Sequence, residues 1–254
     1  MKTKILIQFL SLLLLVTSCS LKETGNDSQV KKAMTLEEVM FEKQTEPVSL
    51  SLALIPDITG SYTTNPESID LKILKSFFET HVGREILGYT NVKENSYTPI
   101  LRWTSLSSVQ DDKNKPVNPW IDSEKTGKQV ETETNLKIDS LNESSFKVFE
   151  SRMKSKIERP VAKRSDVVSA LKRATTFLNE APKSPKVMVV CSDFKDTYKQ
   201  TFKFDKSIKL IMVGNVDSVI VKRCTGLNPT DYSVFESYEE AFNSIVQLYN
   251  NFKK

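Results

Sequence analysis

The sequence has little of the chemistry that most catalytic and zinc-binding proteins use. It contains one histidine, His81, in 254 residues, so a histidine-rich metal site is excluded, and no Cys/His spacing suits zinc. The seven glycines form no glycine-rich phosphate loop. No basic cluster with interleaved aromatic residues is present, and we therefore expect no nucleic-acid partner.

The first 18 residues are typical of a signal peptide and not of a folded domain. Lys2 and Lys4 give a positive start, and Ile5–Val16 is an apolar run of about a dozen residues, shorter than the roughly 20 that a membrane span needs. The tetrapeptide VTSC, which ends at Cys19, resembles the bacterial lipobox. The resemblance implies cleavage before Cys19 and acyl chains on that cysteine, which would anchor the chain to a membrane.

A lipoprotein of this kind is held in the cell envelope. Ser20 rather than Asp follows the cysteine, which by analogy with Gram-negative lipoproteins favours the outer membrane. An ordinary secretory peptide with a chance cysteine is the alternative. Residues 19–47 are polar and charged and are predicted to form a flexible tether, which leaves residues 48–254 as one domain.

Two cysteines remain in the predicted domain. Cys191 and Cys224 could pair in an oxidising compartment. Cys191, however, lies in an apolar, strand-like run, and free cysteine is among the most buried residue types. We therefore predict two unpaired thiols.

Strand-like and helix-like segments alternate along the domain. Apolar runs predict strands at Val48–Ile55, Lys186–Cys191 and Ile208–Gly214, with a short fourth one at Ser218–Val221. Apolar residues at helical spacing predict helices over Glu67–Val82, Val167–Leu178 and Ser237–Phe252. This alternation predicts a doubly wound α/β fold, with a mostly parallel sheet and helices on both faces.

The sequence pattern in the middle of the chain predicts an antiparallel pair of strands at one edge of the sheet. Tyr97–Leu106 has the pattern of a strand, Ser107–Gly127 that of a long exposed loop, and Gln129–Ile138 alternates with the period of a half-exposed strand. Two strands joined by a loop indicate a hairpin at one side of the sheet. Ser145 is expected to cap a helix that runs to about Glu158.

Two of the buried strands end at an aspartate. Asp57 follows the first strand, and Asp193 follows Lys186–Cys191. In a doubly wound sheet, ligands bind beyond the carboxyl ends of the strands, where the strand order reverses. If these two strands are neighbours at that point, both carboxylates face the same crevice.

Hydroxyl groups accompany these carboxylates. Thr59 and Ser61 follow Asp57 at alternate positions, so one short loop offers three oxygens, which suit a hard cation such as Mg²⁺. Ser165, before a helix, and Asp193 could add ligands directly or through water. With few carboxylates around it, such an ion would keep positive character and accept an acidic group from a partner.

This constellation resembles the von Willebrand factor type A (vWA) domain. The metal-ion-dependent adhesion site (MIDAS) of that family has an Asp-x-Ser-x-Ser loop after the first strand, a threonine in a later loop and an aspartate after the fourth strand. Asp57, Thr59 and Ser61 match the first motif, Ser165 matches the threonine and Asp193 the last aspartate. The resemblance extends from Val48 to the C-terminus and implies a central sheet with one antiparallel edge strand.

Together with the lipobox-like sequence at Cys19, the resemblance implies a lipid-anchored binding module. We predict no enzyme, because the sequence offers neither a histidine partner nor an evident acid/base pair. The partner of such a module would be a protein or peptide with an acidic group, held through Mg²⁺ or Mn²⁺. Three departures from the family pattern leave other interpretations open: Pro56 directly before Asp57, serine at 165, and Phe194 where glycine is common. The alternatives are a structural envelope lipoprotein with a metal-free site, a metal-assisted hydrolase, and a simple turn at Asp57 with Ser61 capping the next helix.

Overall fold

The computed structural model describes residues 48–59, 71–79, 83–93, 99–108, 123–157, 163–181 and 183–252. The predictions for the signal peptide, for Cys19 and the tether, and for Ser61 and His81 therefore lie outside the described residues. In the described part of the chain, no helix combines the length and the apolar character that a membrane crossing requires.

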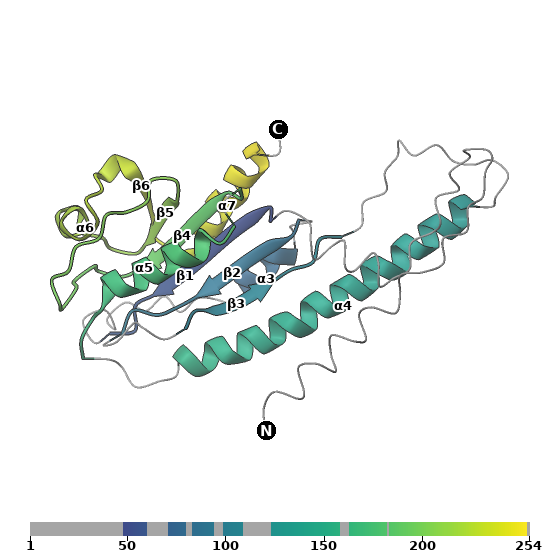
Figure 1. Ribbon diagram of the computed structural model, residues 1–254, viewed down its shortest axis with the longest axis horizontal. Coiled ribbons are helices and arrows are strands. Elements are labelled where there is room, and N and C mark those ends of the chain that lie inside the picture. The colour runs from purple at the N-terminus through teal and green to yellow at the C-terminus, as the bar shows by residue number, and fades with distance from the viewer. Residues whose placement is uncertain are drawn as a thin grey trace, which may run out of the picture. The chain divides into compact units, whose positions relative to one another are not determined.

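The described strands form one six-stranded sheet in the order β3-β2-β1-β4-β5-β6 (Figure 1). The strands are β1 (Leu50–Pro56), β2 (Glu85–Tyr89), β3 (Leu101–Thr104), β4 (Lys186–Cys191), β5 (Lys209–Val213) and β6 (Tyr232–Phe235). Every neighbouring pair is parallel except β2 with β3, which is antiparallel. The predicted α/β fold with a single antiparallel edge strand is confirmed.

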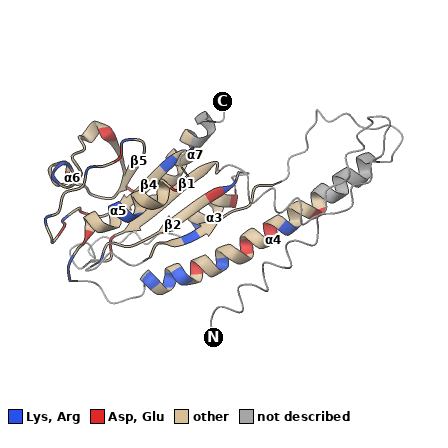
Figure 2. Ribbon diagram, viewed as in Figure 1, with Lys and Arg blue, Asp and Glu red and all other residues tan. Residues whose placement is uncertain are grey.

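Helices cover both faces of this sheet. The elements are α3 (Leu71–Glu79), α4 (Ser123–Ile157), α5 (Val167–Leu178), α6 (Ser218–Thr225) and α7 (Tyr238–Phe252), with a short 3₁₀ turn, η1 (Pro229–Asp231). Successive side chains of β1 point to opposite faces. Leu52 and Leu54 pack with α3, α4 and α7, whereas Ala53 and Ile55 pack with α5 and α6. Figure 2 shows few charged residues in the strands, whereas α4 contains residues of both charges.

The predicted strand over Gln129–Ile138 is wrong, because these residues belong to α4. The alternation there was a short coincidence of threonines with apolar residues: Leu136 is 64% exposed, while Ile138 is buried. From Ile138 onwards the buried residues of α4 follow helical spacing, namely Phe146, Phe149 and Met153. The antiparallel pair at the edge is therefore β2 with β3, and not a hairpin with residues 129–138.

Two further details of this region are corrected. Ser145 lies within α4 and caps no helix; its Oγ accepts a hydrogen bond from Trp103 Nε1 at 3.0 Å. The last residues of the predicted 107–127 loop already belong to α4. The Asn142 side chain on α4 accepts from the Leu106 N–H at 2.8 Å and donates to the Leu106 carbonyl at 3.0 Å. These bonds satisfy backbone groups that continue the edge strand.

The predicted strand at Ser218–Val221 is also wrong, since this segment opens α6. The Asp217 side chain accepts hydrogen bonds from the Val219 and Ile220 N–H groups, and Gly226 ends the helix at φ 75°. These caps outweigh the strand preference of the β-branched residues.

The prediction that Cys191 and Cys224 form no disulfide is confirmed, and both side chains are buried. Burial raises the pKa of the Cys224 thiol to about 12, so this group is protonated and unreactive at neutral pH.

The sequence patterns did not identify β2, a five-residue strand that contains Gly88. A Cβ built on Gly88 would lie 2.6 Å from the Phe177 ring of α5 and 2.9 Å from the Ile100 side chain. Glycine therefore allows α5 to pack directly against the sheet. This close approach fixes the C-terminal end of α5, where Phe177 lies, against β2.

Replacement of Gly88 by alanine should lower the free energy of unfolding by about 1–3 kcal/mol, because the added methyl group overlaps the Phe177 ring. Urea denaturation measures the loss. The loss should be smaller in a Phe177→Leu background, where the ring is absent. An equal loss in both backgrounds would show that the overlap with Phe177 is not the cause.

Candidate metal site at the carboxyl ends of β1 and β4

The strand order reverses between β1 and β4. From β1 the chain continues to β2 on one side and re-enters the sheet at β4 on the other. β1 and β4 are parallel neighbours, as predicted, and Pro56 pairs with Cys191 at their ends. The Asp57 N–H then donates to the Cys191 carbonyl at 2.8 Å. The residues after both strands therefore lie at the same edge of the sheet, at the position where ligands bind in this fold class.

Pro56, one of the departures from the vWA pattern, is compatible with this arrangement. Proline has no N–H to donate, but the Pro56 carbonyl accepts from the Val92 N–H at 2.9 Å. Beyond it, Asp57 forms an isolated parallel bridge with Val92. The end of β1 is thus held by the residues that follow β2 and by those that follow β4.

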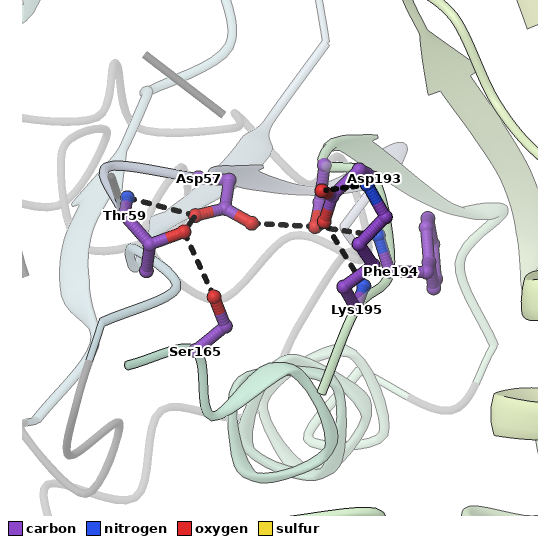
Figure 3. A network of polar contacts seen from close by, with 7 residues as sticks. Asp57, Thr59, Ser165, Asp193, Phe194 and Lys195 are labelled. Atoms are coloured by element: carbon purple, nitrogen blue, oxygen red, sulfur yellow. Dashed lines mark hydrogen bonds and ion pairs between the residues drawn. The ribbon is translucent and has the colours of Figure 1, made fainter. Parts of the chain in front are cut away.

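The Asp57 carboxylate is buried and accepts three hydrogen bonds (Figure 3). Oδ1 accepts from the Thr59 N–H at 2.9 Å and from Thr59 Oγ1 at 2.6 Å. Oδ2 accepts from Ser192 Oγ at 2.6 Å. Ser192 was not among the predicted site residues, since a single serine after a buried strand has no distinguishing pattern until the strand register is known.

Ser165 lies next to Thr59, as the candidate site requires. Its Oγ donates to Thr59 Oγ1 at 2.8 Å, and the residue is 2% exposed. Two hydrogen bonds of 2.9 Å with Thr197, one from the Ser165 N–H and one to the Ser165 carbonyl, hold its backbone. Asp166 caps α5 instead, accepting from the Ser169 N–H. The hydroxyl of Ser165 is therefore not used for capping.

Asp193 enters the site mainly through its charge. Its Oδ1 accepts from the Lys195 N–H at 3.0 Å, and its Oδ2 forms an ion pair with Lys195 Nζ at 3.2 Å. The negative charge of Asp193 contributes to raising the pKa of Asp57. The structure thus brings together Asp57, Thr59 and Ser165 by hydrogen bonds and places Asp193 within electrostatic range.

Burial is the main cause of the raised pKa of Asp57, and the hydrogen bonds from Ser192 and Thr59 oppose it. Loss of hydration makes the charged form of a carboxyl group costly. A positive ion beside the Asp57 carboxylate would offset that cost.

Phe194, the third departure from the family pattern, keeps the backbone conformation that glycine adopts easily. Its φ is 57°, in the left-handed region. The Phe194 N–H donates to Ser192 Oγ at 3.0 Å, and the side chain is 1% exposed in the core beneath α5 and α6. Packing of the ring therefore holds the turn between Ser192 and Lys195.

The donor atoms fit a hard divalent cation. Carboxylate and hydroxyl oxygens are the ligands that Mg²⁺ prefers, and Mn²⁺ accepts the same set. No group of three or more His, Cys, Asp or Glu side chains in the described ranges could hold a metal ion. A cation at this site would therefore depend on the hydroxyls of Thr59 and Ser165 together with the two carboxylates. Ser61 lies outside the described residues.

Comparison with solved structures finds neighbours at low sequence identity. Proximal thread matrix protein 1 from the mussel byssus is 11% identical, with a TM-score of 0.40 over 81% of this chain and 45% of that chain. A further structure of it has a zinc-occupied MIDAS motif. The pilus adhesin SpaC from Lactobacillus rhamnosus GG is 10% identical, with a TM-score of 0.43 over 82% of this chain and 30% of that chain.

The VWA domain of SpRpn10 is 9% identical, with a TM-score of 0.36 over 77% of this chain and 94% of that chain. The present chain spans less than half the length of the byssus protein and of the adhesin. No protein-family model and no curated protein matches the sequence.

Replacement of Phe194 by glycine should lower the free energy of unfolding by about 2–4 kcal/mol, since the lost ring packing exceeds the relief of the left-handed backbone. Lys199 offers a matched control because it also has a positive φ, of 53°, but is exposed. Lys199→Gly should change stability by less than about 1 kcal/mol. If Phe194→Gly were as stable as the unmutated chain in denaturant titrations, the ring would not be what holds this turn.

Proposed function

We propose that the chain is a lipid-anchored, extracytoplasmic binding module that engages a protein or peptide partner through a divalent cation. The ligands are Asp57, Thr59, Ser61, Ser165 and Asp193, and the cation is Mg²⁺ or Mn²⁺. One observation carries the proposal: Ser165 Oγ, Thr59 Oγ1 and the Asp57 carboxylate, which come from two distant segments, form a continuous hydrogen-bonded set beside Asp193. Their convergence places hard oxygens at the strand-order reversal.

The bound cation supplies a positive charge that a carboxylate of the partner can satisfy. Hydroxyl ligands carry no charge, so an ion held largely by them remains attractive to an anion. The chain's own residues orient this site. Ser192 fixes one oxygen of Asp57, and Thr59 fixes the other. Such fixed ligands lower the cost of ordering the site when the partner binds.

A binding role fits these residues better than a catalytic one. The Asp57 carboxylate is occupied by three short hydrogen bonds and buried, so it is poorly placed to take a proton from a substrate. A structural envelope lipoprotein without metal is the second candidate. The observation in its favour is the Lys195 ammonium beside Asp193, because it already neutralises one carboxylate.

Asp57→Asn should abolish Mg²⁺ and Mn²⁺ binding, with a loss of more than about 100-fold in affinity, because it removes a charged ligand. Calorimetric titration of the purified chain measures this loss. Asp205→Asn serves as the control, since Asp205 caps a turn before β5 and has the same charge. No heat with the unmutated chain would favour the metal-free lipoprotein. Phosphatase or esterase turnover that Asp57→Asn abolishes would favour the hydrolase.

In the absence of metal, the same variant should be more stable than the unmutated chain at neutral pH. The folded-state pKa of Asp57 is raised above its unfolded value, so ionisation of this carboxyl group lowers stability as the pH rises. Asparagine removes that cost at neutral pH and gives no gain below about pH 4. Denaturant titrations at both pH values measure the difference. A large loss of stability at pH 7 would assign Asp57 a structural role.

Lipidation at Cys19 and location in the outer membrane form part of the proposal and rest on the lipobox-like tetrapeptide. Intact mass of the mature protein should show a chain that begins at Cys19 and carries acyl mass. Cys19→Ser should leave the signal peptide uncleaved and without that added mass. A wild-type chain that still begins at Met1, or an unmodified Cys19, would refute the anchor.

A further inference from the structure

Lys195 contacts both oxygens of Asp193. Its N–H donates to Oδ1 at 3.0 Å, and its ammonium lies 3.2 Å from Oδ2. The side chain of Lys195 is 61% exposed, whereas that of Asp193 is only 14% exposed. The carboxylate is therefore largely enclosed, whereas the lysine side chain is mostly open to solvent; Figure 3 shows the two residues next to each other.

The turn that holds Lys195 in this position is part of the candidate metal site. Phe194, with its left-handed backbone and buried ring, directs the chain so that Lys195 folds back onto Asp193. Ser192, at the start of the same turn, binds both the Phe194 N–H and Asp57 Oδ2. Residues of one short turn thus contact both carboxylates: the Ser192 hydroxyl contacts Asp57, and Lys195 contacts Asp193.

We propose that Lys195 is a built-in counter-ion of the metal site, and this inference rests on the function proposed above. Without a divalent cation, the Lys195 ammonium neutralises Asp193. When Mg²⁺ or Mn²⁺ binds, it replaces the ammonium at Asp193, and Lys195 moves to the exposed rim of the site. The step is an exchange of one cation for another and changes no covalent bond.

The strength of the ion pair suits such an exchange. A pair with one strongly exposed partner contributes about 0.2–1 kcal/mol, which corresponds to a factor of about 1.4 to 5 in an equilibrium constant. A divalent ion with several oxygen ligands can displace it, but its apparent affinity is reduced by the competition. Lys195 would therefore set the metal concentration at which the site fills.

Exposed basic residues neighbour the site residues along the chain. Lys163 and Arg164, directly before Ser165, are exposed, and so is Lys199 on the segment after Asp193. The carboxylate of Asp196 on that segment accepts from the N–H groups of Val167 and Gln200. A released Lys195 would thus add to a surface that attracts the acidic group of the partner.

The test is titration of the full chain with Mn²⁺, followed by calorimetry and by the electron paramagnetic resonance signal of free Mn²⁺. Lys195→Met removes the ammonium and keeps the apolar stem, and it should bind Mn²⁺ about two- to fivefold more tightly. Lys199→Met removes the same charge four residues further along and should change the affinity by less than about twofold. Lys195→Arg keeps the charge and should stay within about twofold of the unmutated chain.

Each outcome separates the two proposals. Equal affinities for Lys195→Met and Lys199→Met, or weaker binding by Lys195→Met, would overturn the counter-ion role and leave the metal site intact. Tighter binding by both Lys195→Met and Lys195→Arg would show that charge is not the cause, and it would also overturn the role. Absence of Mn²⁺ binding in the unmutated chain and all variants would overturn the metal site and the counter-ion together.

Discussion

The parallel pairing of β1 with β4 is the contact on which the other features of this protein depend. These two strands are separated by more than half of the domain sequence, and their side chains are buried on both faces. Their pairing makes the strand order reverse at this point and brings the residue after each strand to one edge. The helices then pack on a sheet whose centre is already apolar, and α5 brings Ser165 to Thr59. Without this pairing, the oxygens of the candidate site would have no common location.

The cost of burying Asp57 explains why the surrounding residues are polar. A carboxylate away from water needs hydrogen-bond donors, and Thr59 and Ser192 supply them. These bonds hold the carboxylate in one orientation, but burial still raises its pKa. The site therefore stores an unfavourable electrostatic free energy that a cation can relieve. Such a balance is typical of binding sites, where stability is lower than the fold alone would allow.

Long and uniform patterns allowed much of the fold to be predicted. The apolar runs of β1, β4 and β5 and the helical periods of α5 and α7 each reflect burial that recurs along the whole segment. Short elements contain too few residues for such a repeated pattern to be recognised. β2 contains a glycine whose purpose depends on a ring in α5, and α6 depends on its caps more than on its apolar residues. Within α4, a few threonines imitated a strand although the helix continues through them.

The candidate site was likewise predictable only where its residues adjoin long elements with a clear pattern. Asp57, Thr59, Ser165 and Asp193 could be proposed because they follow or precede recognisable elements, and the fold class determines where such residues lie. Ser192 and Lys195 could not be proposed from the sequence, since their roles depend on the direction of the turn after β4. That direction follows from the left-handed backbone at Phe194, which no periodic pattern reveals.

Phenylalanine at position 194 determines the stage at which the turn after β4 loses its conformational freedom. Glycine would leave the turn able to sample both signs of φ until a ligand ordered it. A ring buried in the core fixes the turn during folding, so the entropy is lost before any ligand arrives. Movement of this turn would require the ring to leave the core. Binding at the proposed site would therefore be coupled to the stability of the whole domain and not to the mobility of a loop.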